Sequence, residues 1–193
     1  MAKIKVCGMT NLEDCLKAQE LAVDFVGFVF FRKSRRYVKP EKAREICGTL
    51  GRSVSTVGVF VEEGDDEIRG IVDYCGLDLA QVYGESALPR TIRAFRVAHA
   101  LPPSLPQKGL VLFDSYSDGF GGSGRSFDIS LLSGRAFLDR AFIAGGITVE
   151  NVRNVLCLKP FGVDLVSSLE TYPGKKDHKK MERFVKTVRS FAL

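Results

Sequence analysis

The sequence predicts an α/β fold in which eight parallel strands alternate with helices, and three observations support this. Eight short apolar runs, rich in β-branched residues, recur along the chain. The runs are nearly continuous in hydrophobicity, which is typical of parallel strands covered on both faces. Amphipathic segments separate most of them. The predicted strands are residues 4–7, 25–30, 54–61, 77–82, 94–98, 110–114, 141–144 and 163–166.

Start and stop signals support five of the intervening segments as helices. Asn11 is a good N-cap residue, Pro40 suits a first helical turn, and Gly76 is a typical C-terminal stop. Thr148 is a further N-cap candidate, and Pro160 follows the end of its segment. The predicted helices are residues 12–21, 40–50, 65–75, 148–156 and 179–191.

The segments after the fourth to sixth strands give weaker signals. Residues 89–92 allow at most a short helix, and the prolines of 102–106 exclude a regular one. Residues 131–138 are helix-like but contain Ser133 and Gly134.

Eight strand–helix units in one domain favour a closed barrel over an open sheet. The prediction is a compact, single-domain TIM (β/α)8 barrel of eight parallel strands over residues 1–193. An open doubly wound sheet is the main alternative, but its glycine-rich dinucleotide fingerprint does not follow the first strand. A typical TIM barrel has about 250 residues, so loops and some helices must be short here.

Composition narrows the class of protein. The longest apolar run, residues 25–31, has the length of a strand, and the N-terminus lacks a signal-peptide core. We therefore expect a cytoplasmic protein without membrane contact. The 5 cysteines include no Cys-x-x-Cys pair and there are only 2 histidines, so neither a metal site nor a disulfide framework is expected.

The net charge of +5 suits either nucleic-acid binding or attraction of a small anion. Nucleic-acid-binding proteins tend to gather basic residues on one stripe, whereas here they are spread along the chain. The densest groups are residues 32–36 and 175–176. Ordinary solvated charge is the default interpretation of most of them, and no nucleic-acid partner is expected.

Catalytic groups of such barrels lie where the strands end. Cys7 ends the first strand, where a thiolate can act as a base or nucleophile, although most buried thiols serve only packing. Arg36 lies in the basic loop after the second strand, and its planar fork suits a carboxylate, although a solvated loop is the alternative. Gln81 ends the fourth strand and can hydrogen-bond a substrate or face solvent.

The loop after the sixth strand, residues 116–128, is glycine-rich. Gly122 and Gly124 would let its backbone approach a ligand closely. Asp128 at its end is a candidate acid. The alternative, which the sequence alone favours, is that Asp128 caps the following helix.

Loops after the last two strands often bind phosphate through backbone N–H groups. Gly145 and Gly146 follow the seventh strand, while Ser167 and Ser168 follow the eighth. Two independent loops therefore have the residue types expected of a phosphate site. Asp164 lies within the eighth strand. A carboxylate there is costly unless paired, so it is either a site residue or a partner in a structural ion pair.

Several motifs taken together resemble the phosphoribosylanthranilate isomerase family of tryptophan biosynthesis. The resemblance spans nearly the whole chain in the right order, and the first and the glycine-rich motif are specific in combination. The motifs are residues 5–11 (KVCGMTN), 24–30 (DFVGFVF), 34–38 (SRRYV), 57–60 (VGVF), 121–128 (GGSGRSFD), 144–147 (AGGI) and 172–177 (YPGKKD).

The resemblance implies a role for each candidate. Cys7 would be the general base and Asp128 the general acid. Arg36 would bind the anthranilate carboxylate, and Asp164 matches a family active-site aspartate. The loops at Gly145–Gly146 and Ser167–Ser168 would hold the phosphate.

The implied reaction is the Amadori rearrangement of N-(5-phosphoribosyl)anthranilate to 1-(2-carboxyphenylamino)-1-deoxyribulose 5-phosphate, without metal or organic cofactor. A thiolate requires nearby positive charge, and Lys5, on the same side of its strand, is a possible source. The sequence departs from the family at 82–84, Val-Tyr-Gly for Leu-His-Gly, and at 166–168, Val-Ser-Ser for Ser-Ser-Gly. Arg32 stands where proline is common.

Two alternatives remain open. One is the related phosphosugar isomerase of histidine biosynthesis, which uses two aspartates where this chain offers Cys7 and Asp128. The other is a non-catalytic module that binds phosphate or nucleic acid. The expected partner is a small phosphosugar, and the chain is expected to be a monomer or a homodimer.

Overall fold

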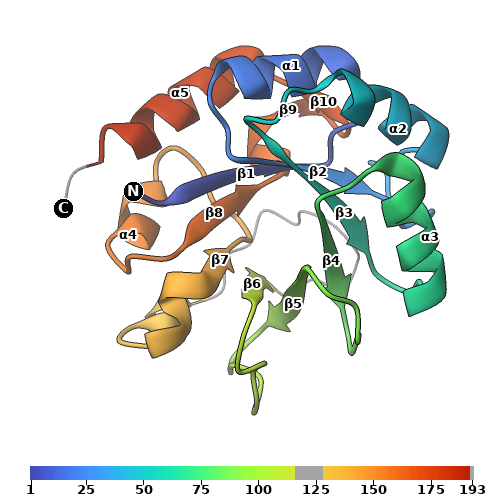
Figure 1. Ribbon diagram of the computed structural model, residues 1–193. Coiled ribbons are helices and arrows are strands. Elements are labelled where there is room, and N and C mark those ends of the chain that lie inside the picture. The colour runs from blue at the N-terminus through green and yellow to red at the C-terminus, as the bar shows by residue number, and fades with distance from the viewer. Residues whose placement is uncertain (116–127, 192–193) are drawn as a thin grey trace.

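A closed barrel of parallel strands dominates the computed structural model, which describes residues 1–115 and 128–191. The strands follow one another around the ring in chain order, and the last pairs with the first, with Lys5 opposite Asp164 (Figure 1). This confirms the predicted fold class. The strands are β1 (Lys3–Cys7), β2 (Phe25–Val29), β3 (Ser55–Phe60), β4 (Leu79–Tyr83), β5 (Thr91–Val97), β6 (Leu110–Ser115), β7 (Ala141–Ile143) and β8 (Gly162–Leu165).

Helices lie outside the ring, and most begin where the sequence signals them. The Asn11 side chain accepts a hydrogen bond from the Asp14 N–H at the start of α1, and Gly76 adopts a left-handed φ of 68° at the end of α3. Asp177 caps the last helix. The α-helices are α1 (Leu12–Glu20), α2 (Pro40–Thr49), α3 (Asp65–Cys75), α4 (Val152–Leu156) and α5 (His178–Arg189).

The weakly signalled segments differ from the predictions. A short helix at 89–92 is wrong, because Thr91 and Ile92 already belong to β5. The helix-like stretch 131–138 divides into two 3-10 turns, η1 (Ile129–Leu132) and η2 (Ala136–Arg140), since Gly134 interrupts it with a φ of 70°. The β5–β6 side therefore carries no α-helix among the described residues (Figure 1).

The chain after β8 forms a structure that the sequence does not predict. A 3-10 turn, η3 (Ser167–Leu169), leads into a small antiparallel hairpin of β9 (Glu170–Tyr172) and β10 (Lys175–Lys176). The hairpin lies between the mouth of the barrel and α1 and α5 (Figure 1).

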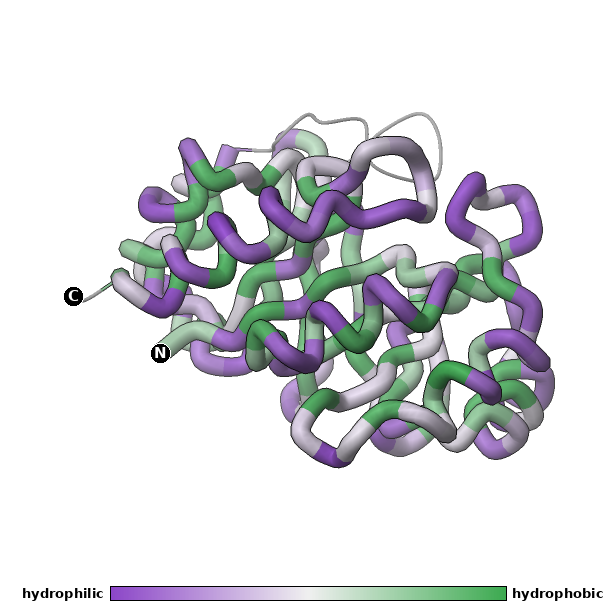
Figure 2. Tube along the Cα trace, turned by 90° about the horizontal axis from the view of Figure 1, so that it is seen from above, coloured by the Kyte–Doolittle hydropathy of each residue, from purple (hydrophilic) through white to green (hydrophobic). Residues whose placement is uncertain are grey.

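Two layers of core hold the barrel. The larger core lies between the strands and the helices. In Figure 2, hydrophobic (green) stretches lie mainly inside the molecule and hydrophilic (purple) ones mainly at its edge. The smaller fills the inside of the barrel, where the Phe25 and Phe142 rings pack edge to face with centroids 5.3 Å apart. Within the described chain, no helix is both long enough and apolar enough to span a bilayer.

Candidate functional site

A cavity opens at the carboxyl ends of the barrel strands. It encloses about 980 Å³, counting the space open to solvent at its mouth. Every strand except β7 contributes a residue to it, and the loop after β7 contributes residues 144–147. The candidate residues that line it are Cys7, Arg36, Gln81, Gly145, Gly146, Asp164, Ser167 and Ser168. The topology thus brings together predicted positions that lie up to 161 residues apart, from 7 to 168.

Cys7 lies on the floor of this cavity above a buried ion pair. Lys5 and Cys7 share one side of β1, because side chains alternate along a strand. The Lys5 ammonium lies 2.9 Å from the Asp164 carboxylate, and its positive charge acts on the Cys7 thiol. Burial raises the pKa of the Cys7 thiol, whereas the charges of Lys5 and Lys176 oppose that rise.

Asp164 therefore fits both interpretations of the sequence, since it lines the cavity and is paired structurally. Its side chain is 5% exposed and that of Lys5 is fully buried. Burial raises the pKa of Asp164 against the influence of Lys5. Burial disfavours the charge on Lys5, but the attraction of Asp164 and Cys7 holds its pKa above the ordinary value.

Arg36 is held at the cavity wall by a residue that sequence reasoning missed. Both carboxylate oxygens of Glu170 accept hydrogen bonds from Arg36, at 2.9 Å and 3.1 Å from Nε and 2.7 Å from NH2. Glu170 also accepts from Lys176, whose Nζ donates to the backbone carbonyl oxygens of Cys7 and Val166. The hairpin after β8 thus fixes the ends of β1 and β8 relative to Arg36.

The charges of this network support one another. Although burial raises the pKa of Glu170, the hydrogen bonds from Arg36 and Lys176 bring it below its ordinary value. Burial lowers the pKa of Lys176. Lys176 belongs to the family-like motif 172–177, whereas Glu170 lies two residues before that motif, and nothing in the motif points to Arg36.

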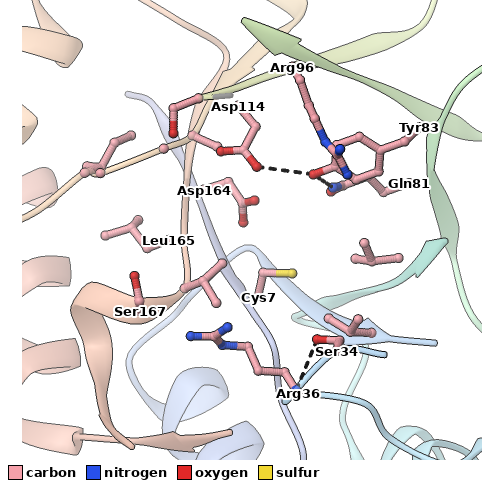
Figure 3. Close-up of a pocket in the computed structure, with 18 of the residues that line it drawn as sticks. Cys7, Ser34, Arg36, Gln81, Tyr83, Arg96, Asp114, Asp164, Leu165 and Ser167 are labelled. Carbon is pink, nitrogen blue, oxygen red and sulfur yellow. Dashed lines mark hydrogen bonds between the residues drawn. The ribbon is translucent and has the colours of Figure 1, made fainter. Parts of the chain in front are cut away.

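The β4–β6 side of the cavity holds further groups that the candidate list omitted. The Tyr83 hydroxyl donates to Asp114 at 3.3 Å and accepts from the Gln81 amide at 3.4 Å. The Arg96 guanidinium lies over the Tyr83 ring, 5.1 Å from its centroid (Figure 3). Burial, followed by the nearby Asp164 charge, raises the pKa of Asp114 to about 6. Asp114 and Arg96 lie near the ends of strands, so the strand-end rule applied throughout would have found them.

The loops after β7 and β8 form one corner of the cavity. Gly145 and Gly146 adopt left-handed φ angles of 81° and 65°. A Cβ atom at Gly145 would lie 2.6 Å from the Ser115 backbone nitrogen, so only glycine fits there. Asn151 secures this turn through a 2.8 Å hydrogen bond to the Gly146 carbonyl oxygen. With Ser167 opening η3 beside them, backbone N–H groups are available for an anion.

The remaining candidates are placed differently. Asp128 is exposed and is not among the residues that line the cavity. Its side chain accepts a 2.9 Å hydrogen bond from the Ser130 N–H and so caps η1, as the alternative interpretation of the sequence expects. The Ser130 hydrogen bonds lower the pKa of Asp128. Gly122 and Gly124 lie outside the described residues.

Comparison with known proteins agrees with the geometry. The family profile described as N-(5'-phosphoribosyl)anthranilate (PRA) isomerase matches residues 4–187. The chain belongs to this family. It is 40% identical over 206 aligned residues to the N-(5'-phosphoribosyl)anthranilate isomerase of Rubrobacter xylanophilus, covering 98% of this chain and 100% of that protein.

Solved structures of phosphoribosylanthranilate isomerases have the same fold. The Thermus thermophilus enzyme superposes with a TM-score of 0.86 at 33% identity, covering 97% of this chain and 98% of that one. A second isomerase, solved in complex with reduced 1-(o-carboxyphenylamino)-1-deoxyribulose 5-phosphate, gives a TM-score of 0.80 at 33% identity, covering 99% and 100%. Family membership therefore rests on sequence and fold alike.

Proposed function

We propose that this chain isomerises N-(5-phosphoribosyl)anthranilate to 1-(2-carboxyphenylamino)-1-deoxyribulose 5-phosphate. One observation carries the proposal beyond family membership. A buried thiol with an ammonium group beside it shares a cavity with two glycine- and serine-containing loops at the ends of β7 and β8. This reaction requires, among other groups, a proton acceptor and an anion site.

The substrate lies across the cavity with its two ends bound apart. Backbone N–H groups near Gly145, Gly146, Ser167 and Ser168 hold the phosphate. Arg36 binds the anthranilate carboxylate, and Glu170 orients its guanidinium through Nε and NH2. Among the described residues nothing bonds NH1 of Arg36, which leaves that nitrogen for the ligand.

The chemistry consists of proton transfers. The acid is Asp128, which in this structure caps η1 outside the cavity, so to act it must carry a proton and turn from the Ser130 N–H toward the substrate. It then donates that proton to the ring oxygen, the bond from that oxygen to C1 breaks, and the amine nitrogen forms a Schiff base with C1. The Cys7 thiolate removes the proton from C2, and the electron pair moves to the iminium nitrogen. The enolamine then tautomerises to the ketone. The iminium is the electron sink, so neither a metal nor an organic cofactor is required.

Lys5 supports the base. The charge of its ammonium group favours the Cys7 thiolate, while Asp164 keeps Lys5 in place at 2.9 Å. The proposal includes a single catalytic domain over residues 1–193 that works in the cytoplasm as a monomer or homodimer.

Growth of a tryptophan auxotroph that lacks this isomerase tests the proposal. Expression of the wild-type chain is expected to restore growth without tryptophan, and the Cys7→Ala chain is expected to fail although it is expressed equally. Failure of the wild-type chain to rescue, with no turnover of the purified protein, would overturn the proposal.

The purified protein separates the two alternatives. Turnover of only the histidine-pathway substrate would identify the related isomerase. A binding module would show no turnover and steeply salt-dependent binding to polyanions.

A further inference from the structure

The cavity holds a second arginine on the wall away from the phosphate loops. Arg96 is the penultimate residue of β5. Its guanidinium is stacked on the ring of Tyr83, whose hydroxyl hydrogen-bonds Gln81 and Asp114. In Figure 3, Arg96 lies beside Tyr83 and Gln81, whereas the guanidinium of Arg36 turns toward the side of Ser167. The two arginines therefore enter the same cavity from different walls.

Gln81, next to Arg96, has a side-chain oxygen, Oε1, that receives no hydrogen bond from the described residues. Its side chain is 2% exposed, and within residues 1–115 and 128–191 no group donates a hydrogen bond to Oε1. A buried acceptor left unpaired is costly, and such atoms are rare in folded proteins. Because Gln81 lines the cavity, a ligand that carries an N–H or O–H group would complete it.

Anthranilate carries a hydrogen-bond donor for Gln81 and an anion for Arg96 on adjacent carbons of one ring. Its amine nitrogen is a donor and its carboxylate is an anion, in the ortho position. The N–H needs an acceptor and the carboxylate needs a cation nearby, which Gln81 Oε1 and Arg96 supply. Val59 and Val61 line the same cavity and give the aromatic ring an apolar wall.

We propose that Arg96 binds the anthranilate carboxylate, in addition to Arg36, and that Gln81 Oε1 accepts the adjacent amine N–H. This inference rests on the proposed function and makes Arg96 a specificity-determining residue of that site. The Tyr83 ring orients the Arg96 guanidinium through a cation–π contact, so Tyr83 belongs to the same carboxylate-binding site. This chain has Tyr83 where the family has histidine, and Tyr83 contacts Arg96 on the next strand, β5.

A pair of substrates isolates the role of the carboxylate. The probes are N-(5-phosphoribosyl)anthranilate and N-(5-phosphoribosyl)aniline, which lacks only the carboxylate. For Arg96→Met we expect KM for the first to rise roughly 10- to 100-fold, as for loss of a charge-assisted hydrogen bond. KM for the aniline should change less than about twofold, and inhibition by inorganic phosphate should be unaffected.

Arg93 provides the matched control on the same strand. It lies three positions from Arg96, so it faces the other side of β5, and it pairs with Glu85 at 2.9 Å. Arg93→Met should leave KM for both substrates unchanged, and Arg96→Lys should recover part of the loss for the anthranilate.

The outcomes that overturn the inference are specific. An equal rise in KM for both substrates in Arg96→Met would mean that Arg96 only supports the fold of the wall. An unchanged KM for the anthranilate, with an active wild-type enzyme, would remove Arg96 from carboxylate binding. An inactive wild-type enzyme would instead overturn the proposed function, and this inference with it.

Discussion

The Lys5 ammonium and the Asp164 carboxylate form an ion pair of 2.9 Å inside the barrel, directly beneath Cys7. Both residues lie opposite each other where β1 closes the ring against β8. A buried ion pair rarely adds net stability, because its desolvation costs about as much as the attraction returns. Its value here is positional, because it holds a positive charge beside the thiol.

Removing the lysine tests that interpretation. We expect Lys5→Met to lower the free energy of unfolding by about 3–5 kcal/mol, because Asp164 is left buried without its partner. The acidic limb of the kcat/KM profile should move to higher pH, because Lys5 no longer opposes the rise in the Cys7 pKa caused by burial. Denaturant unfolding and a pH–rate profile measure the two effects.

The double variant Lys5→Met/Asp164→Leu separates stability from chemistry. It removes both charges, so most of the lost stability should return, while the activity should stay low. A wild-type pH profile in the single variant Lys5→Met would show that Lys5 has no influence on Cys7.

The acid–base assignment predicts large effects on turnover. We expect Cys7→Ala and Asp128→Asn each to lower kcat by about 10²-fold or more, the range for general acid–base groups. Asparagine caps helical turns as well as aspartate does, so Asp128→Asn should preserve the hydrogen bond to the Ser130 N–H and the fold of η1. Steady-state kinetics and thermal unfolding measure both.

Two exposed residues serve as controls for these variants. Cys157 is an exposed thiol, and Asp66 pairs with Arg69 on the surface. Cys157→Ala and Asp66→Asn should keep wild-type kcat. Near-normal turnover in Cys7→Ala or Asp128→Asn would remove that residue from the mechanism.

The Arg36–Glu170 pair predicts an effect on binding. Arg36→Met should raise KM more than it lowers kcat, because the contact exists in the ground state as well as in the transition state. Glu170→Gln should also raise KM and should cost about 3–5 kcal/mol of stability, since Arg36 and Lys176 lose a buried counter-charge.

Glu62 is the matched control for Glu170. Its ion pair with Lys33 is exposed, with 52% of the Glu62 side chain accessible, and such pairs contribute about 0–1 kcal/mol. Glu62→Gln should therefore change neither KM nor stability measurably. An unchanged KM in Arg36→Met would exclude Arg36 from substrate binding.

The parts predicted from the sequence are those with a local cause. Apolar runs predict the strands, and the strand-end rule predicts Cys7, Gln81 and Asp164 at one end of the barrel. Glu170 and Lys176 were not foreseen, because their partners lie across the barrel, with Arg36 134 residues before Glu170. The strand-end rule reaches Arg96 as well, but its contact with Tyr83 depends on the pairing of β5 with β4, which the sequence does not show.

Glycine at 27 is predicted to set the position of the thiol. A Cβ atom there would lie 2.7 Å from Cys7 Sγ and 3.2 Å from Cys7 Cα, closer than van der Waals contact allows. Gly27→Ala should therefore displace the thiol, lower kcat more than it raises KM, and cost about 1–3 kcal/mol through overpacking.

At Gly48, in contrast to Gly27, substitution by alanine is expected to stabilise the protein. It lies within α2, and nothing lies within 4 Å of a Cβ added there. Gly48→Ala should raise stability by about 0.5–1 kcal/mol and leave kcat unchanged. Wild-type kcat in Gly27→Ala would show that β2 does not constrain Cys7.

Asp114 predicts an unusual pH dependence of stability. Its pKa of about 6 in the folded chain lies above the ordinary value of 3.8, through burial and the Asp164 charge, while Lys5 and the Tyr83 hydroxyl only moderate the rise. Between pH 4 and 6 the folded chain holds a proton on this group that the unfolded chain has released. The contribution of Asp114 to stability therefore falls as pH rises through this window and is constant above it.

Asp114→Asn removes this titration. The variant should match the wild-type chain near pH 4 and exceed its free energy of unfolding by up to about 3 kcal/mol at pH 7, the equivalent of the raised pKa. Urea unfolding of both chains at several pH values gives the difference directly, and Asp66→Asn at the exposed site should show none. A stability difference that does not grow between pH 4 and 6 would mean that Asp114 ionises in the folded chain as it does in the unfolded one.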